Sequence, residues 1–323
     1  MKTEISATLR RILNDTQAEL EHDKSRKSVK RLKHMIRDAV PLISFSSALS
    51  PGQALIAEIK ERSPSQGKMR PQNVQEAPEA YKKSRAVKAI SVLTSWKNFG
   101  QNMRIEMMEA IKRQTSKPVL RKDFILEEYQ IYQARAYGAD AILLMANILE
   151  AEEMRRLSDL ALELGMDVLF ETHRAEELDE LPGTAKIIGI NCRSFEGGLS
   201  LSNFTIARFL RQVLGTKRDQ SVDLSRFEYA EKLPERAIKV AESGVSAENC
   251  REVFELGFHS ILVGTSLLMD TRGVSAGLHD FEAALKEAAA DKQAPNTRLQ
   301  APEKDQTPSS KTSELGGSST TQG

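Results

Sequence analysis

The sequence predicts an α/β protein whose folded part is a single (β/α)8 barrel of the TIM type, with a helical extension before it and a disordered tail after it. Three observations predict this fold. Eight short apolar runs recur along the chain, and six of them end in a polar or charged residue. Seven segments between the runs are long enough for a crossover, and most of them have helical patterning. A barrel needs about 250 residues, so the 323 residues leave no room for a second catalytic domain.

The eight runs are the predicted parallel strands. In chain order they are Leu55–Lys60, Ala89–Thr94, Pro118–Lys122, Ala139–Met145, Asp167–Glu171, Lys186–Asn191, Ala237–Ser243 and His259–Gly264. The clearest helices between them are predicted at Met103–Arg113, Leu126–Tyr137 and Ala151–Leu164. The carboxyl ends of barrel strands build the active site. We therefore expect the chemistry at the polar residues near those ends, which include Glu58, Lys60, Lys122, Glu171, Asn191 and Ser243.

The segments outside the barrel differ from it in composition. Residues 1–46 are highly charged, with apolar residues at near-helical spacing, and predict an extension that covers either the bottom of the barrel or its mouth. The barrel is expected over residues 47–290, with an exposed excursion at Gly215–Arg226. Residues 291–323 are rich in Gln, Pro, Thr, Ser and Gly. Such a segment buries too little apolar surface to offset its ordering entropy, so we expect disorder.

The overall composition is that of a soluble globular protein, with 40% hydrophobic and 28% charged residues. The net charge of +1 gives no support for a nucleic-acid or membrane partner. Two cysteines form neither a disulfide framework nor a metal-ligand pattern. The N-terminal residues lack the apolar core of a signal peptide, and no run approaches the roughly 18 apolar residues of a membrane span. These features favour a cytoplasmic location.

The first predicted strand carries two charges on one side. Side chains alternate along a strand, so Glu58 and Lys60 point one way while Ala57 and Ile59 point the other. If the apolar pair faces the helices, both charges lie inside the barrel, where an unpaired charge costs several kcal/mol. Two interpretations remain open, namely a structural ion pair and a lysine for an anionic group that a carboxylate orients.

Strands three and five suggest an acid and a base. Alternation turns Lys122 away from Arg121 and Asp123, and desolvation can lower the pKa of such a lysine into the range of a general acid. The alternative is a surface Arg121–Asp123 pair beside a solvated Lys122. Glu171 is expected across the barrel from Lys122 as its acid–base partner. His173, two residues further on, is expected to be a solvated or packed histidine.

The remaining strand ends suggest anion binding. Asn191 can donate or accept a hydrogen bond, Arg193 can hold a carboxylate, and Cys192 between them should point away. Gly244 and Gly264 follow strands seven and eight, where many (β/α)8 barrels bind phosphate. Ordinary tight turns are the alternative for these glycines.

Several long motifs in the same order resemble the indole-3-glycerol phosphate synthase family from about Leu55 to Met269. They are IAEIKERSPSQG, ISVLTSWKNFG, VLRKDFILEEYQIYQARAYGADAILL, LFETH, IIGINCR, VAESGV and ILVGTSLL. The resemblance implies a carboxy-lyase of tryptophan biosynthesis. It would convert 1-(2-carboxyphenylamino)-1-deoxyribulose 5-phosphate to indole-3-glycerol phosphate by ring closure, with loss of CO2 and water. It implies no cofactor and no metal.

The resemblance also assigns the proton-transfer roles. Lys122 would be the general acid that protonates the ribulose carbonyl, and Glu171 would be the general base that assists the loss of water. Lys60 would contact the anionic groups of the substrate and could take part in proton transfer. Glu58 and Asn191 would orient the reacting chain.

The substrate-binding residues follow from the same resemblance. Ser63 and Arg193 match positions that meet the anthranilate carboxylate, and Phe99 matches an apolar residue near the aromatic ring. The phosphate cradle and the residues beside it would be Gly244, Gly264, Thr265, Glu242 and Ser243. We expect a monomer that acts on a phosphorylated small molecule, and we leave open contacts with other enzymes of the pathway.

The chain departs from the family pattern in the loop after the second strand and in strand six. Ser95, followed by Trp96, stands where an acidic residue is expected, Gln101-Asn102 replaces small residues, and Cys192 replaces a second asparagine. Two other functions are alternatives to the synthase. A catalytically silent, phosphate-binding barrel should lack an acid or base group, and phosphoribosylanthranilate isomerase has a cysteine on its first strand. This chain has Glu58 and Lys60 on that strand instead.

Overall fold

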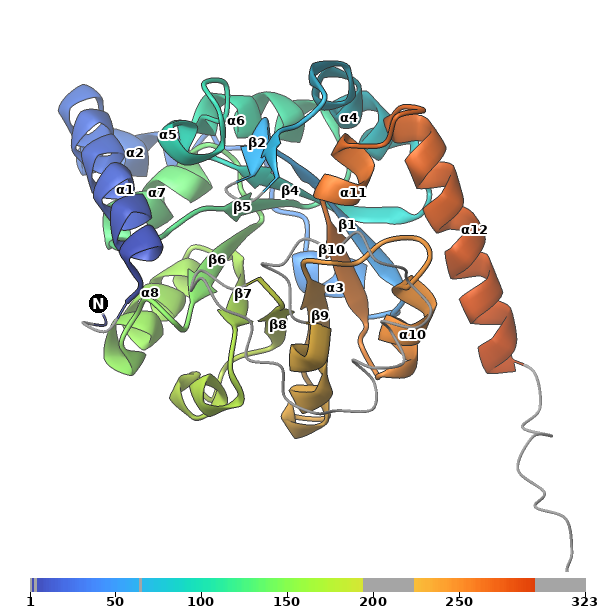
Figure 1. Cartoon of the computed structure of the whole chain (residues 1–323). Coiled ribbons are helices and arrows are strands. Elements are labelled where there is room, and N and C mark those ends of the chain that lie inside the picture. The colour runs from blue at the N-terminus through green and yellow to red at the C-terminus, as the bar shows by residue number, and fades with distance from the viewer. Residues whose placement is uncertain (1, 3–4, 64–65, 194–223, 294–323) are drawn as a thin grey trace, which may run out of the picture.

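Eight parallel strands close into a barrel in the computed structural model, which describes residues 2, 5–63, 66–193 and 224–293. Around the barrel the hydrogen-bonded order is β1-β10-β9-β8-β7-β6-β5-β4, so the last strand in the chain pairs with the first (Figure 1). The strands are β1 Ala54–Ile59, β4 Val87–Leu93, β5 Val119–Lys122, β6 Ala141–Met145, β7 Asp167–Thr172, β8 Ile187–Asn191, β9 Ile238–Glu242 and β10 Ser260–Val263. Each overlaps one predicted strand, and the barrel prediction is confirmed.

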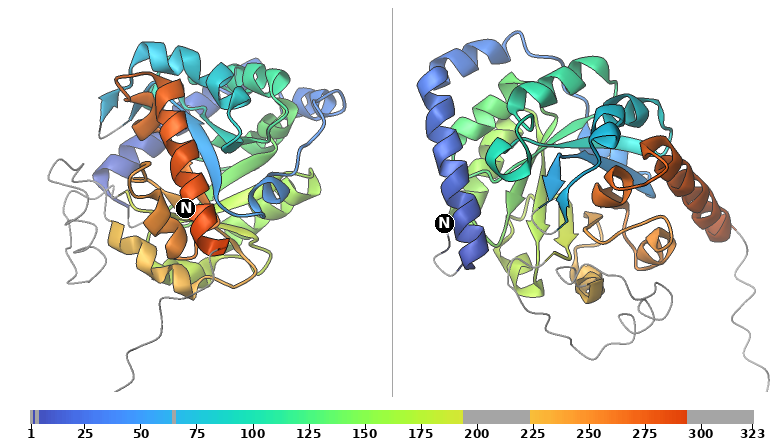
Figure 2. Two further views of the ribbon diagram at one scale, coloured as in Figure 1. Left: turned by 90° about the vertical axis from the view of Figure 1, so that its right-hand side faces the viewer. Right: turned by 45° about the horizontal axis from the view of Figure 1, so that its top comes forward.

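Helices form the layer outside the strands, as the two views of Figure 2 show. They are α4 Pro71–Lys83, α6 Ile105–Gln114, α7 Glu128–Ala136, α8 Ala151–Glu163, η1 Ala175–Glu180, η2 Leu224–Lys232, α10 Cys250–Glu255 and α12 Val274–Gln293. The predicted helices after strands two, three and four correspond to α6, α7 and α8. Short elements follow the strand ends at the mouth, namely β2 Arg62–Ser63, β3 Gly67–Lys68, α5 Trp96–Phe99 and α11 Thr265–Leu268.

The strands are apolar because helices cover their outer faces while side chains fill the barrel. All six residues of β1 are buried, including the charged Glu58. Strands of parallel sheets are typically near-continuous apolar runs for this reason. The few charged residues inside such runs are therefore the exceptions that need partners. None of the helices in the described part of the chain is long and apolar enough to cross a membrane.

The N-terminal extension reaches both ends of the barrel. Helix α1, Ala7–Arg26, packs on α5 near the mouth, and α2, Val29–Ile36, packs along α7. At the bottom, Ser46 in α3, Phe45–Leu49, donates its backbone N–H to Asp167 Oδ2 over 2.8 Å. The sequence left the bottom and the mouth as alternatives, and the structure places parts of the extension at each.

Two other sequence expectations fall largely outside the described residues. Of the predicted excursion Gly215–Arg226, only residues 224–226 are described; they begin η2, and Leu224 is buried rather than exposed. Of the predicted tail, Asp291–Gln293 belong to α12, and residues 294–323 lie outside the described part.

A buried ion pair fixes the extension to the bottom of the barrel. Lys112 in α6 donates to both carboxylate oxygens of Asp140 over 2.8 and 2.7 Å, and both side chains are fully buried. The same carboxylate accepts the backbone N–H of Ile43 and that of Val119, each over 2.7 Å. Asp140 therefore joins the extension, α6 and the start of β5 in one hydrogen-bond network.

At the mouth, a carboxylate from the extension holds the loop that follows β4. Glu19 in α1 is 7% exposed, and its Oε1 accepts hydrogen bonds from Ser95 Oγ over 3.2 Å and from the backbone N–H of Lys97 over 2.5 Å. Thus Ser95, which departs from the family pattern, is the hydrogen-bond partner of an acidic residue from α1. Burial, followed by the nearby Asp123, raises the pKa of Glu19 to about 7.

Replacing Lys112 by Met should lower the free energy of unfolding by about 3–5 kcal/mol, because the Asp140 carboxylate would stay buried without its cation. The neighbouring Arg113→Ala is the matched control. It removes the exposed pair with Glu109, at 2.7 Å, and should cost under about 1 kcal/mol. Urea denaturation measures both. Equal losses in the two variants would contradict a special role for the buried pair.

Glu19 should make the protein less stable as the pH rises. The unfolded carboxyl ionises near its ordinary value of 4.5, whereas the folded one stays protonated up to about 7, so this stabilising contribution declines between those values. Glu19→Gln should remove that decline, and denaturation at pH 5 and pH 8 would measure it. Glu21→Gln, an exposed change on the same helix, is the control. A pH dependence unchanged in Glu19→Gln would refute this assignment.

Candidate active site

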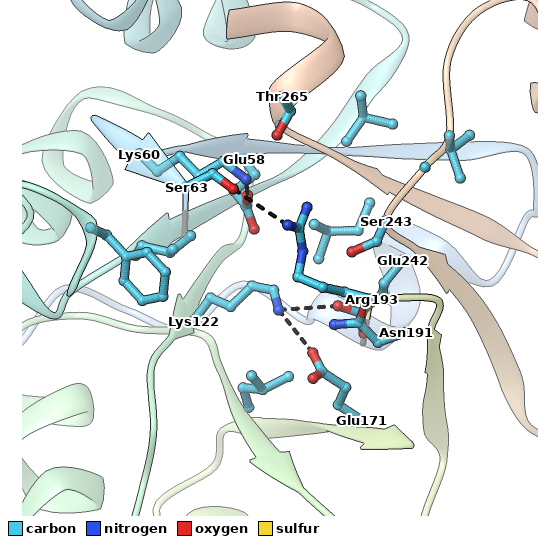
Figure 3. A pocket seen from close by; sticks show the side chains of 18 of the residues that line it. Glu58, Lys60, Ser63, Lys122, Glu171, Asn191, Arg193, Glu242, Ser243 and Thr265 are labelled. Atoms are coloured by element: carbon cyan, nitrogen blue, oxygen red, sulfur yellow. Dashed lines mark hydrogen bonds and ion pairs between the residues drawn. The ribbon is translucent and has the colours of Figure 1, made fainter. Parts of the chain in front are cut away.

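A cavity of about 300 Å³ opens at the carboxyl ends of the strands. All the site residues predicted from the sequence line this cavity. They are Glu58, Lys60, Ser63, Phe99, Lys122, Glu171, Asn191, Arg193, Glu242, Ser243, Gly244, Gly264 and Thr265. Their side chains come from loops and strand ends on opposite sides of the barrel (Figure 3). The alternation of side chains along each strand, together with closure of the barrel, brings them to one place.

Lys122 lies between two carboxylates. Its Nζ donates to Glu171 Oε2 over 2.9 Å and lies 3.1 Å from Glu242 Oε2 (Figure 3). The Lys122 side chain is 14% exposed, and both glutamates are 1% exposed. The alternative of a solvated Lys122 is therefore wrong. The lysine lines the cavity together with both glutamates.

The expected lowering of the Lys122 pKa is also wrong. Burial by itself favours the neutral amine, but the carboxylates of Glu171, Glu242 and Glu58 outweigh it and raise the pKa above the ordinary lysine value. Lys122 is consequently a protonated ammonium at neutral pH. The sequence indicated the desolvation of this lysine but gave no information on how many carboxylates surround it.

Glu171 and Glu242 compete for the same lysine. For Glu171, burial favours the neutral acid, but Lys122, His173 and the hydrogen bonds to Lys122 and Glu242 together outweigh burial and lower the pKa of the carboxyl. For Glu242, burial and then the negative charge of Glu171 raise the pKa despite the same ammonium. Two close carboxylates ionise as a coupled pair, so Glu171 carries the charge and Glu242 the proton near neutral pH.

The resemblance placed Glu242 beside the phosphate cradle, and the structure shows in addition that it contacts Lys122. Its carboxylate reaches the floor of the cavity because Gly189, on the neighbouring strand β8, has no side chain there. A Cβ added at Gly189 would overlap Glu242 Oε1. A glycine on the neighbouring strand, two residues before the one that pairs with a strand-end glutamate, is the sequence signal that could have indicated this arrangement.

Glu58 and Lys60 form the predicted pair inside the barrel. Lys60 Nζ donates to Glu58 Oε1 over 2.6 Å, and both side chains line the cavity. Burial lowers the pKa of Lys60, although Glu58 opposes the shift. Gly264 leaves room for this pair, because an added Cβ would lie 2.5 Å from Glu58 Oε1. The missing side chain of Gly264 thus makes space for the Glu58 carboxylate. This role is separate from the phosphate binding that the sequence suggested for Gly264.

A second charged pair is formed by the residues on either side of Lys122 in the sequence, of which Asp123 also lines the cavity. Arg121 Nη2 donates to Asp123 Oδ2 over 2.9 Å, and Thr94 Oγ1 donates to the same oxygen over 2.6 Å. Arg121 and Asp123 are 3% and 5% exposed. The Arg121–Asp123 pair was predicted as an alternative, but it is buried and not on the surface. It fixes the carboxyl end of β5, from which Lys122 projects the other way.

Asn191 and Arg193 shape one wall of the cavity. Asn191 Oδ1 accepts the backbone N–H of Arg193 over 2.9 Å, and Arg193 Nη1 donates to Ser63 Oγ over 3.5 Å. Cys192 between them is fully buried and is not among the lining residues, as alternation predicts. The Arg193 guanidinium therefore extends across the cavity toward the loop after β1 (Figure 3).

The turns after β9 and β10, the next two strands around the barrel, continue this wall. Ser243 and Gly244 have φ of +68° and +74°, and this region costs a non-glycine residue about 1–2 kcal/mol. Asn249 holds the turn, because its Nδ2 donates to Gly244 O over 2.9 Å and its Oδ1 accepts the Ser246 N–H over 2.8 Å. Thr265 begins α11 beside this turn and also lines the cavity.

An apolar wall completes the cavity. The rings of Phe99 and Phe124 are stacked, with centroids 5.9 Å apart and planes 7° from parallel. Both line the cavity, together with Leu93, Leu143, Met145 and Leu262. Within the described residues, no group of three or more His, Cys, Asp or Glu side chains is placed to hold a metal ion.

Known proteins are similar to this chain over most of its length. The family model of indole-3-glycerol phosphate synthase matches residues 9–214. The synthase of Bacteroides thetaiotaomicron is 32% identical over 262 residues, covering 80% of this chain and 92% of the relative. The synthase of Desulforamulus reducens is 38% identical over 248 residues, covering 75% and 84%. That of Aquifex aeolicus is 34% identical over 251 residues, covering 76% and 88%.

Among solved structures, 3-hexulose-6-phosphate synthase from Salmonella typhimurium superposes with a TM-score of 0.51 at 15% identity, covering 73% of this chain and 99% of that one. This likeness supports the barrel fold alone. The family model covers residues 9–214, and these three relatives cover 75–80% of the chain. The chain belongs to the indole-3-glycerol phosphate synthase family of carboxy-lyases.

Proposed function

We propose that the protein converts 1-(2-carboxyphenylamino)-1-deoxyribulose 5-phosphate to indole-3-glycerol phosphate in tryptophan biosynthesis, with Lys122 as general acid and Glu171 as general base. The observation that carries the proposal is the Lys122 ammonium between Glu171 and Glu242 on the floor of the cavity, 2.9 and 3.1 Å away. A proton donor and a proton acceptor in contact with each other suit a reaction that adds and later removes a proton.

Two parts of the cavity suit the two ends of this substrate. The carboxylate end would meet Arg193 and Ser63, with Lys60 nearby, because guanidinium and hydroxyl groups bind carboxylates well. The phosphate end would bind at the turns that contain Ser243, Gly244, Gly264 and Thr265. The aromatic ring would lie against Phe99 and Phe124.

Ring closure requires an acid at the ribulose carbonyl. As the aromatic carbon that bears the carboxylate attacks the carbonyl carbon, Lys122 gives its proton to the oxygen, which becomes a hydroxyl. Loss of CO2 returns its bonding electrons to the ring and restores aromaticity. Negative charge develops on the carbonyl oxygen during the attack, and an ammonium held there in a buried site stabilises it.

Loss of water requires a base. Glu171 accepts a proton from the methylene carbon next to nitrogen while the new hydroxyl takes a proton from Lys60 and leaves as water, and the double bond of the indole forms. Glu171 is ionised in the empty site, as this step requires. Glu58 and Asn191 would orient the reacting chain, and Lys60 would hold the departing carboxylate or share in proton transfer.

The alternatives find less support. A catalytically silent barrel should lack an acid or a base at the cavity, yet Lys60, Lys122 and Glu171 all line it. An isomerase of the phosphoribosylanthranilate type would need a cysteine where strand β1 carries Glu58 and Lys60.

Lys122→Ala and Glu171→Gln should each reduce turnover by about 10²- to 10⁴-fold, since each removes a proton-transfer group. Indole fluorescence after addition of the carboxyphenylamino substrate measures the product. Lys82→Ala on the exposed surface of α4 is the control and should leave turnover unchanged. Folded wild-type protein that binds the substrate but forms no indole would contradict the proposed function and favour the silent barrel.

Arg193→Ala should raise the KM for the substrate about 10-fold or more, because a charged hydrogen bond contributes about 1.5–3 kcal/mol. The product has lost the carboxylate, so its Kd should change little in the same variant. Titration calorimetry with the product and steady-state kinetics with the substrate compare the two. A similar loss of affinity for both would show that Arg193 does not read the carboxylate.

A further inference from the structure

Helix α5 carries Phe99, which lines the cavity, and is too short to be stable by itself. It spans four residues, and its internal backbone hydrogen bond runs from the Phe99 N–H to Ser95 O over 2.9 Å. A single turn of helix is unfavourable in isolation, because several backbone angles are fixed for one bond. The position of Phe99 therefore depends on groups outside α5.

The amino end of α5 is capped from a distant part of the chain. Ser95 is the N-cap residue, with φ of −92° and ψ of 104°, but among the described residues its side chain caps no N–H of this helix. Glu19 in α1 takes that role. Its Oε1 accepts the Lys97 N–H over 2.5 Å and the Ser95 hydroxyl over 3.2 Å. A residue 78 positions earlier thus supplies the acceptor that an N-cap side chain usually provides.

We propose that Glu19 is a positioning residue for substrate binding: by capping α5 from α1, it holds Phe99 against the aromatic ring of the substrate. The inference rests on the proposed function, because it takes the ring to lie beside Phe99. Glu19 itself would not touch the substrate. It lines a separate cavity, together with Thr94 and Trp96, and is not among the residues that line the cavity at the strand ends.

The carboxylate of Glu19 is presented from a firmly held helix. Glu19 lies on the buried face of α1, and α1 packs beside α5 (Figure 1). One turn further along, Asp23 Oδ2 accepts from Gln133 Nε2 over 2.8 Å, and Lys24 Nζ donates to Glu127 Oε2 over 2.9 Å. Both partners belong to α7 or its N-cap. Helix α1 is therefore anchored to the barrel next to the residue that caps α5.

The carboxyl end of α5 is held separately, by the loop after β1. Phe99 O accepts the Glu61 N–H over 3.0 Å, and Asn98 O accepts from Arg62 Nε over 2.9 Å. Both ends of the helix are thus fixed by other parts of the chain. Loss of Glu19 would leave the amino end without its cap, and the helix could then tilt about the end that stays bound.

The acid and the base should be unaffected by such a tilt. Lys122 and Glu171 project from β5 and β7, which pair with neighbouring strands of the barrel. Phe99 would contact the substrate ring in the ground state and in the transition state alike. Removing a contact of that kind raises KM and leaves kcat nearly unchanged.

Four variants test the cap in steady-state kinetics. We expect Glu19→Ala to raise KM about 3- to 30-fold, the range for loss of one helix cap, with kcat unchanged. Glu19→Gln keeps an oxygen acceptor in place and should keep the wild-type KM. Adding Ser95→Asp to Glu19→Ala should restore KM, because an aspartate at the N-cap accepts the helix N–H locally. Glu21→Ala, the same change at an exposed position of α1, is the control.

Two ligands separate the loss of a ring contact from general distortion of the site. The product retains the aromatic ring, so its Kd should rise together with KM in Glu19→Ala, unlike in Arg193→Ala. Inorganic phosphate has no ring, so its inhibition constant as a competitor of the substrate should stay unchanged. Titration calorimetry and inhibition kinetics measure the two. Equal weakening of product and phosphate would overturn the proposal.

The single tryptophan of the chain provides a readout that does not require turnover. Trp96 is the first residue of α5, and its ring lies 4.5 Å from the Arg104 guanidinium. In Glu19→Ala without ligand, we expect its fluorescence to shift to longer wavelengths and acrylamide to quench it more. Glu19→Gln and the double variant should match the wild type. An unchanged spectrum in Glu19→Ala would refute the cap.

Two further results would contradict the proposal. One is a wild-type KM in Glu19→Ala, and the other is an equal rise of KM in Glu19→Ala and Glu19→Gln. Thermal unfolding is recorded for each variant. If Glu19→Ala does not fold, Glu19→Asp replaces it, because its carboxylate is one methylene too short to reach the Lys97 N–H. Absence of indole from wild type would refute the proposed function instead, while Trp96 fluorescence would still report on the cap.

Discussion

The buried ammonium of Lys122 between Glu171 and Glu242 is the interaction on which the rest of the site depends. With Glu58 and Lys60 nearby, the floor of the barrel contains three glutamates and two lysines. These five groups carry no net charge when one carboxyl keeps its proton, and burial together with the charge of Glu171 favours that proton on Glu242. The Arg193 guanidinium, which also acts on Glu58 and Lys60, adds a positive charge beside them. An unbalanced charge at this depth would cost several kcal/mol. The composition and proton content of the cluster are therefore linked to the stability of the barrel.

Glycines make the cluster sterically possible. Gly189 leaves space for the carboxylate of Glu242, and Gly264 leaves space for that of Glu58. In each case the glycine lies on the strand, or just after the strand, that neighbours the glutamate. Removing a side chain on one strand allows a charged side chain from the next to point into the cavity. A glycine at a barrel mouth can allow close contact with a substrate or make room for a neighbouring side chain. For both Gly189 and Gly264 the structure shows the second reason.

The N-terminal extension stabilises the barrel at two separate places. Asp140 joins the extension to the bottom through backbone and lysine donors, and Glu19 joins α1 to the loop that carries Phe99. Phe99 in turn stacks on Phe124 at the apolar wall of the cavity. In the loop after β4, Ser95 stands where the family pattern has an acidic residue. The structure shows that the acidic partner comes from a helix more than 70 residues earlier in the chain, since Glu19 and Ser95 are 76 residues apart.

The sequence by itself determined the barrel, the eight strands and the set of residues at its mouth. Alternation along a strand is a local rule, so the direction of Glu58, Lys60, Lys122 and Cys192 could be predicted without any structure. What only the tertiary structure decided is which groups meet: Glu242 with Lys122, His173 with Glu171, Glu19 with Ser95, and a buried Arg121 with Asp123. The tertiary structure also decided the direction of the Lys122 pKa shift. Burial of one lysine is a local property, but electrostatic energies in a buried site depend on the distances to charges from other strands, and closure of the barrel sets those distances.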